Sequence, residues 1–168
     1  MTSLSIDARR ELAARVGVAV FLASWAMVFV ALLFSHLLLE SQIIGTRPAL
    51  PVGLAALSTG LLLLSTFAAR LANQRHAAVI SAAIGLGFVA MQALLWAELS
   101  NRGLWPQDSQ LASSLYALTG FHAVHVAVGI GGLLWVAARN PRGLRWWRLY
   151  WDFVALAWLA IFMLGFVL

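Results

Sequence analysis

Two histidines stand out as residues that could do chemistry, because both fall inside one long apolar stretch. His122 and His125 lie in the segment SLYALTGFHAVHVAVGIGG, and a spacing of three places them on one face of a helix. Ionisable side chains within membrane segments are costly and are functional candidates by default. One interpretation is therefore a pair of ligands for a haem or a metal ion.

The rest of the chain offers little to complete such a site. The other two histidines, His36 and His76, fall near the outer end of the first apolar stretch and in a loop, and the chain has no cysteine. A metal site needs three or four ligands, and no carboxylate is expected at the depth of the pair. We favour two neutral imidazoles that hydrogen-bond to neighbouring helices, backbone carbonyls or lipid, and we expect no catalytic residue, metal or cofactor in this chain.

Three further polar side chains fall within or at the ends of apolar stretches. Gln92 is expected near mid-membrane, where its amide can bond to another helix. Asp152 lies one turn inside the last stretch, and we expect it to pair with Arg148 or Arg145 at the interface, the alternative being a proton relay. Glu98 is expected to be a solvated end residue. All three favour helix packing over catalysis.

These residues must be positioned by membrane helices. Of the 168 residues, 62% are hydrophobic and 10% are charged, whereas soluble domains carry about 25% charged residues. About 20 apolar residues cross the roughly 30 Å hydrocarbon layer. The chain has five such stretches, at 16–38, 50–69, 77–99, 111–138 and 149–168. We expect an all-α membrane protein, a single five-helix transmembrane domain at 16–168 after a cytoplasmic N-terminal segment at 1–15.

The loops between the stretches contain turn-forming residues and arginines. Turn formers include Gly45, Pro48, Asn140, Pro141 and Gly143. The last loop, RNPRGLRWWRLYW, is expected to place Trp146, Trp147 and Trp151 in an interfacial belt. Glycines of the third and fourth stretches are expected to let helix backbones approach closely; these are Gly85, Gly87, Gly129, Gly131 and Gly132.

The arginines predict the orientation. Arg47 and Arg102 fall on one side of the five stretches, and the other nine arginines fall on the opposite side. Arginine is enriched in cytoplasmic loops, so we expect the N-terminus in the cytoplasm and the C-terminus in the periplasm. The formal charge of +5 is spread along membrane flanks, so no nucleic-acid partner is expected.

Two motifs near the C-terminus resemble subunit III of the cytochrome c oxidase (haem-copper oxidase) family. YALTGFHAVHVAVG runs from Tyr116 to Gly129, and YWDFVALAWLAIF runs from Tyr150 to Phe162. FLASWAMVF, the region around Ser58, and the interval from Gly85 to Gln92 match more weakly. Together they are similar to the short, five-helix form of the family.

The resemblance implies a non-catalytic accessory subunit of a bacterial haem-copper terminal oxidase of the cytochrome c oxidase type, in the inner membrane and the aerobic respiratory chain. It implies haem and copper in partner subunits, direct packing against subunit I, and subunit II and other respiratory complex subunits nearby. It also implies bound phospholipid. The residues that match the family, with their neighbours, are candidates for structural, lipid or subunit contacts: His122, His125, Gln92, Trp151, Asp152 and Trp158.

Some of the family's ionisable residues are absent. Its intramembrane glutamate falls on Trp25, a second glutamate falls on Leu95, and a His and an Asp of its last helix fall on Asp152 and Ala155. Proton-handling roles of those residues therefore do not carry over. Alternatives are the equivalent subunit of a quinol oxidase, a protein associated with nitric oxide reductase, a small membrane cytochrome b with His122 or His125 as ligand, or a small transporter.

Overall fold

The computed structural model describes residues 3–42, 50–71, 74–139 and 144–167, and within these ranges the chain is helical, without strands. The predicted turn formers Gly45, Pro48, Asn140, Pro141 and Gly143, and also Arg47 and Arg142, lie outside the described residues. The elements are α1 (Ser3–Ser41), α2 (Val52–Ala68), α3 (Gln74–Asn101), α4 (Gln110–Arg139), α5 (Leu144–Phe162) and a closing π-helical turn, η2 (Met163–Val167).

The predicted all-α membrane fold with five helices is confirmed. Four helices of the described residues are long and apolar enough to cross a membrane, and α2, with 17 residues, is a shorter apolar helix. That length lies at the lower limit of about 17–25 residues for a span. The last helix begins at Leu144, earlier than the predicted residue 149, because the arginine- and tryptophan-rich segment continues the helix instead of forming a loop.

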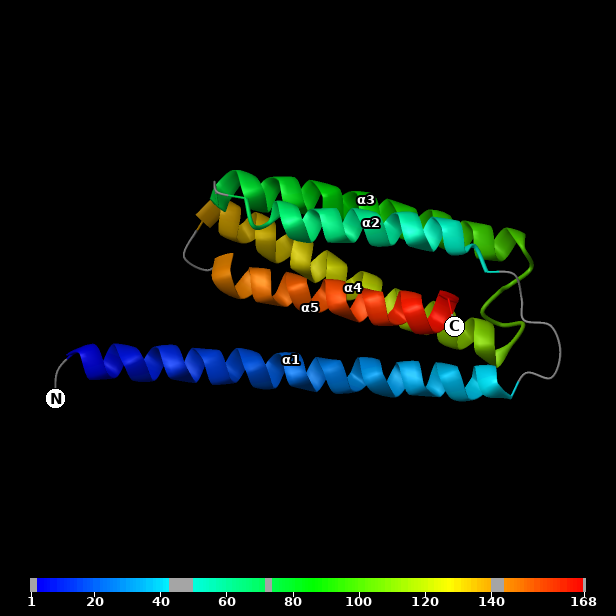
Figure 1. The fold of residues 1–168 in the computed structure, drawn as a ribbon, viewed down its shortest axis with the longest axis horizontal. Helices are drawn as coiled ribbons and strands as arrows, with labels where there is room; N and C mark the ends of the chain where they lie inside the picture. The colour runs from blue at the N-terminus through cyan, green and yellow to red at the C-terminus, as the bar shows by residue number, and fades with distance from the viewer. Residues whose placement is uncertain (1–2, 43–49, 72–73, 140–143, 168) are drawn as a thin grey trace.

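The helices form a four-helix bundle with a fifth helix along one side. In Figure 1, α2 and α3 lie side by side, and α4 and α5 lie below them. The helix α1 runs along the side of α4 and α5 that faces away from α2 and α3. The helix α1 packs against α4, α5 and η2. It also extends well past the other helices at its N-terminal end (Figure 1). The core therefore lies mainly between α2, α3, α4 and α5, and α1 adds Phe29 and Leu33 to it.

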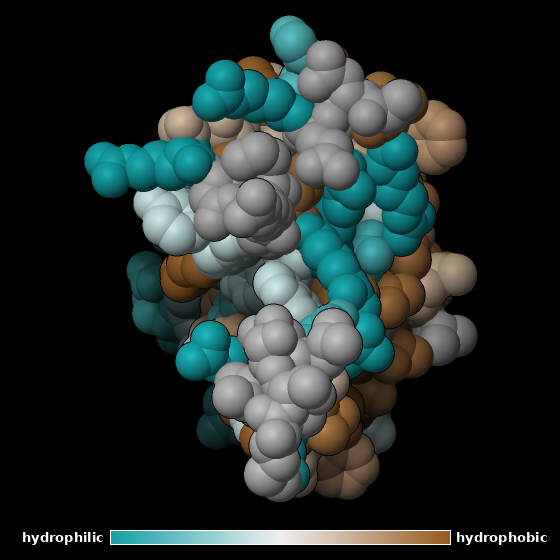
Figure 2. Space-filling view, turned by 90° about the vertical axis from the view of Figure 1, so that its left-hand side faces the viewer, coloured by the Kyte–Doolittle hydropathy of each residue, from teal (hydrophilic) through white to brown (hydrophobic). Residues whose placement is uncertain are grey.

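Polar side chains gather at one end of the bundle. Figure 2 views the end where α1 begins and where α4 meets α5, and hydrophilic side chains cover much of it while apolar ones lie along the flanks. Arg70, Arg75, Arg139 and Arg145 come from the helix ends that meet there. This distribution is typical of a helical membrane bundle.

Candidate functional site

His122 lies at the centre of the bundle and is completely buried. Its ring centroid lies 5.1 Å from that of Trp158 on α5, 5.6 Å from Phe88 on α3 and 6.0 Å from Phe29 on α1. Neither ring nitrogen has a hydrogen-bond partner among the described residues. The expected hydrogen bonds of this imidazole are thus replaced by contacts with aromatic rings.

His125, one turn along the same helix, lies at the contact between α4 and α1. Its ring centroid is 4.5 Å from that of Trp25, in a T-shaped arrangement, and its Nδ1 lies 2.8 Å from the carbonyl oxygen of Phe121. A carbonyl only accepts, so Nδ1 carries the proton. The backbone carbonyl of His125 also accepts a bond from the Tyr150 hydroxyl, at 3.1 Å. The two histidines therefore have different surroundings, and the structure does not join them into one ligand pair.

Trp151 is part of the core, so its predicted place in an interfacial belt is wrong. It is completely buried, and its Nε1 donates to the hydroxyl of Ser65 at 3.1 Å. Ser65 and Ser81 in turn bond to each other's backbone carbonyls, at 2.7 and 2.9 Å. Because α5 begins at Leu144, Trp151 falls two turns inside the helix, on the face that packs against α2. It joins three helices through one polar cluster.

Trp158 repeats this arrangement two turns further along α5. It is completely buried, and its Nε1 donates to the Thr59 hydroxyl on α2 at 2.9 Å. The Thr59 hydroxyl in turn donates a hydrogen bond to the Ala55 carbonyl at 2.7 Å. On the other side of the bundle, Trp96 Nε1 donates to Thr119 at 3.0 Å. Each indole is satisfied by a hydroxyl group on a neighbouring helix, as a buried polar group requires.

The hydroxyl groups were not among the predicted site residues. Ser58 and Ser65 lie seven residues apart on α2, as do Thr59 and Thr66, and all four are buried. Seven residues are about two helical turns, so such pairs share one face. That spacing within an apolar helix is the sequence signal that could have identified the face of α2 that binds α5.

Three glycines make room for tryptophan rings, not for the helix backbones that were expected. A Cβ on Gly129 would lie 2.5 Å from the ring of Trp151, and one on Gly132 would clash with the ring of Trp147. A Cβ on Gly85 would lie 3.0 Å from Trp151. The glycines of α3 and α4 thus form the surface that admits the tryptophans of α5. Two glycines of the predicted set lack such close contacts, namely Gly87 and Gly131.

Asp152 is paired with a different arginine from the two that were expected. Its Oδ1 lies 2.8 Å from Nη2 of Arg70, at the end of α2, and not beside Arg148 or Arg145. Arg145 instead lies 3.2 Å from Glu11 of α1. The difference arises because α2 ends beside the first turns of α5, a proximity that is not visible in the local sequence. Asp152 therefore connects two helices at the bundle end.

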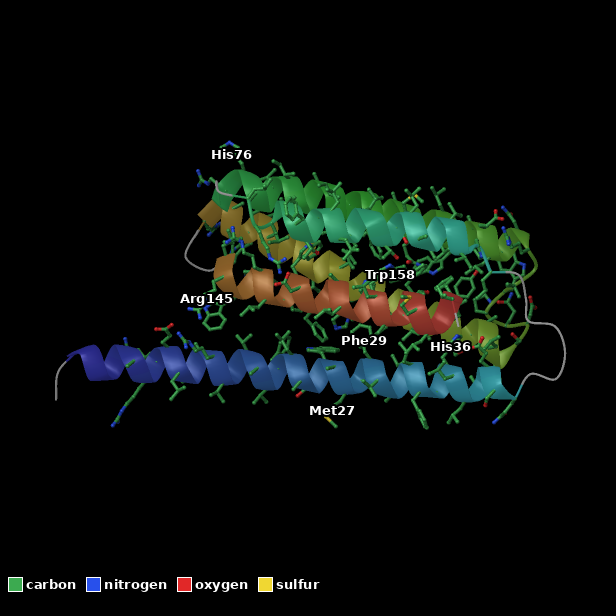
Figure 3. All side chains as sticks on the ribbon, viewed as in Figure 1. Met27, Phe29, His36, His76, Arg145 and Trp158 are labelled. Carbon is green, nitrogen blue, oxygen red and sulfur yellow. The ribbon has the colours of Figure 1, made fainter. Side chains whose placement is uncertain are left out.

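Three other polar side chains complete the inventory. Gln92 on α3 is buried, and neither atom of its amide has a partner among the described residues. Glu98, near the end of α3, pairs with Arg102 at 2.8 Å, and both side chains are exposed. His36 near the end of α1 is also buried, with Nδ1 2.8 Å from the Ser114 hydroxyl on α4, a contact that sequence reasoning missed. Figure 3 shows His36 at this outer end.

The arrangement of polar side chains positions the helices against one another. Within the described ranges, no group of three or more His, Asp or Glu side chains could hold a metal ion. The polar groups that have partners join α2 to α5, α3 to α4, and α1 to the bundle.

Comparison with known proteins identifies the family. No family model matches the chain. In an alignment 178 positions long, the chain is 31% identical to cytochrome c oxidase subunit 3 of Synechocystis. The match covers 90% of this chain and 74% of that protein. The chain belongs to the cytochrome c oxidase subunit III family. The resemblance seen in the motifs of α4 and α5 is confirmed. The chain is an accessory subunit III of a haem-copper oxidase.

Other relatives differ in the oxidase that their names specify. The probable cytochrome c oxidase subunit 3 of Mycobacterium tuberculosis is 28% identical, with 88% of this chain and 84% of that protein covered. The cytochrome bo(3) ubiquinol oxidase subunit 3 of Pseudomonas putida is 27% identical, with 68% and 60% covered. For the probable quinol oxidase subunit 3 of Staphylococcus haemolyticus, at 29% identity, the chain spans about half of its length, 51%. The family thus includes relatives named for either electron donor.

Proposed function

We propose that this chain is the non-catalytic third subunit of a bacterial aerobic terminal oxidase of the cytochrome c oxidase type, and that it packs directly against the haem-copper subunit I. Haem and copper reside in the partner subunits, with subunit II alongside. The location is the inner membrane, with the N-terminus in the cytoplasm and the C-terminus in the periplasm. Membership of the subunit III family carries the proposal, and the use of buried polar groups to hold helices together supports it.

Bound phospholipid is part of the same proposal. A groove of about 400 Å³ runs between α1 and α5 and is lined only by apolar side chains, including Phe29, Leu33, Phe153 and Ala160. Such a groove suits an acyl chain, because neither the groove nor the chain has a polar group to satisfy. In Figure 3, Phe29 points from α1 toward α5, whereas Met27 points away from the bundle. The helix α1 would then hold lipid against the bundle.

The experiment that tests the function is affinity purification of the chain from its native membrane in mild detergent, followed by mass spectrometry and an optical spectrum. We expect a haem-copper subunit I to co-purify and to account for all of the haem. Purification of the chain alone, with a Soret band of its own, would overturn the proposal in favour of a membrane cytochrome b. As a control, His122→Leu and His125→Leu should leave the haem content per subunit I unchanged.

The lipid proposal has its own test. Ala160→Phe fills the groove and should lower the amount of phospholipid that co-purifies with the complex. Ala90→Phe adds the same bulk at an exposed site on α3 that does not line the groove, and it should leave lipid content unchanged. Equal lipid content in both variants would contradict lipid binding in this groove.

A quinol oxidase subunit is the second candidate function. The observation that favours it is the similarity to subunit 3 of the Pseudomonas putida ubiquinol oxidase and of the Staphylococcus haemolyticus quinol oxidase. The purified complex should be offered reduced cytochrome c and, separately, ubiquinol. Oxidation of cytochrome c supports the first candidate, and oxidation of the quinol without that of cytochrome c supports the second.

A further inference from the structure

Two side chains in the bundle core have polar atoms with no partner, and both are almost completely buried. Gln92 on α3 is 1% exposed and His122 on α4 is 0% exposed. Nδ1 and Nε2 of the imidazole, and the oxygen and nitrogen of the amide, have no hydrogen-bond partner among the described residues. A buried polar group left in this state is destabilising, and the tryptophans nearby are all satisfied. These two residues therefore require an explanation of their own.

The register of α3 against α4 places the two side chains at the same level. Trp96 of α3 donates to Thr119 of α4, and Arg75 of α3 donates to the carbonyl of Ala138 of α4. Between these two pairs, a Cβ on Gly85 would touch Ile130. The helices are thus antiparallel, and the same register puts residue 92 opposite residues 122 and 123. Gln92 and His122 therefore lie at the same level of the interface between α3 and α4.

Both side chains also belong to the same compartment of the core. The ring of His122 contacts Phe88, with centroids 5.6 Å apart, and Phe88 precedes Gln92 by one helical turn on the same face of α3. The ring of Trp158 closes the compartment from α5, 5.1 Å from His122, and Phe29 lies toward α1. The groups identified around His122 are therefore aromatic and uncharged.

The chemistry of the two side chains specifies what they could share. The glutamine amide offers donors and an acceptor, and a neutral imidazole offers one donor and one acceptor. Water, with two donors and two acceptors, can bond to both at once. Buried waters usually make about three such bonds to polar groups that have no other partner. A metal ion does not fit, because only one of the two side chains is a usual ligand.

We propose that Gln92 and His122 form a binding site for an ordered water molecule that bridges α3 and α4 at mid-membrane. The water acts as a polar clamp between these two helices, as the hydroxyl groups of Ser65 and Thr59 do between α2 and α5. His125 is not part of the site, because its Nδ1 already donates to Phe121 and its ring lies against Trp25 on α1. The proposal does not depend on which oxidase contains the chain.

The direct test is a cryo-electron microscopy map of the intact oxidase at a resolution that shows ordered water. We expect a density peak within about 2.7–3.2 Å of a polar atom of both side chains. A map in which the amide bonds directly to the imidazole, or in which no peak lies between them, overturns the proposal. This test uses the wild-type complex, so it does not depend on any variant folding.

The energetic test is a double-mutant cycle on the thermal unfolding of the purified complex, with Gln92→Leu, His122→Phe and the double variant. A shared water makes the changes non-additive, and we expect a coupling of about threefold to twentyfold in the unfolding equilibrium, the range measured for polar contacts between membrane helices. His122→Gln keeps a donor and an acceptor and should preserve most of the stability that His122→Phe loses. Additive effects would contradict a shared site.

The matched control for this cycle is Ser58→Ala. Ser58 is equally buried, and its hydroxyl bonds to the Ala55 carbonyl of its own helix. Its removal should therefore show no coupling to Gln92→Leu. Coupling of the same size in this control would mean that the cycle reports general loosening of the bundle and would remove the support for the water site.

Discussion

The helices α5 and α1 are both apolar, yet they are held in opposite ways. Tryptophans of α5 insert into glycine sites and bond to hydroxyl groups on α2. By contrast, α1 is mostly exposed to its surroundings, and Phe29, Leu33 and His36 are its buried residues among those described. Its polar links lie near its ends, at Glu11 and at His36. The comparison indicates that α1 is attached along one side of α2 to α5 and adds Phe29 and Leu33 to their common core.

The largest expected effect comes from filling a tryptophan site. Gly129→Ala would place a methyl group 2.5 Å from the ring of Trp151, which is fully buried and cannot move aside. We expect a loss in stability at or above the upper end of the roughly 1–3 kcal/mol that overpacking costs, measured by thermal unfolding of the purified subunit. Gly131→Ala is the matched control, because no atom lies within 4 Å of its added Cβ. Equal tolerance of both changes would show that α5 does not need this fit.

Loss of one indole hydrogen bond should have a smaller effect. Trp158→Phe keeps an aromatic ring in the core but removes the donor that bonds to Thr59. We expect a loss of about 1–3 kcal/mol, from the missing bond and the reduced volume. A double-mutant cycle that combines Trp158→Phe with Thr59→Val measures the interaction energy between the two side chains. If the two changes are additive, the hydrogen bond does not hold α5 to α2.

Weakening the contact of α1 should loosen this helix without disturbing the bundle. Trp25→Ala removes the T-shaped contact with His125, and such aromatic pairs contribute about 0.5–1.5 kcal/mol beyond burial. We expect faster hydrogen exchange in α1 while α2 to α5 stay protected. A uniform increase in exchange over all helices would show that α1 is an integral part of the bundle.

The smallest effect is expected at the end of α1. Glu11→Gln removes the ion pairs with Arg15 and Arg145, all of which are exposed. Exposed pairs contribute little and are screened by salt. The midpoint temperature of thermal unfolding should therefore be slightly lower than that of the wild type at low salt. In high salt the two midpoints should be equal. A large decrease that persists in high salt would mean that this contact, and not the aromatic one, holds α1.

Much of the fold follows from patterns that are local in the sequence. Five apolar stretches of sufficient length predict five helices, because unsatisfied backbone groups are not tolerated in hydrocarbon. The motifs from Tyr116 to Gly129 and from Tyr150 to Phe162 predict the family. Both are confirmed, since neither depends on how the helices are arranged. The orientation of the termini stays a prediction from the arginines.

The errors share one physical cause. The sequence predicts an interfacial belt for Trp151 and an ion pair with Arg148 or Arg145 for Asp152. It also predicts that the glycines lie against the backbones of other helices. For Asp152 and the glycines, the residue type predicted the kind of contact, an ion pair or a close approach. The partner, however, belongs to another helix, and its identity depends on the rotation and height of each helix in the bundle. Sequence spacing constrains these quantities only within one helix.

The sequence alone therefore determined the number of helices, their membrane character and the family, because hydrophobic length and motif order are properties of the chain itself. Only the tertiary structure decided that Arg70 pairs with Asp152 and that Trp151 bonds to Ser65. It also separated His122 from His125, because three residues fall short of a full helical turn by about 60°, so that one imidazole lies at the bundle centre and the other at the contact with α1. The physical reason is that packing between helices joins residues that are far apart in the chain, such as Thr59 and Trp158, at 99 positions, and Glu11 and Arg145, at 134 positions.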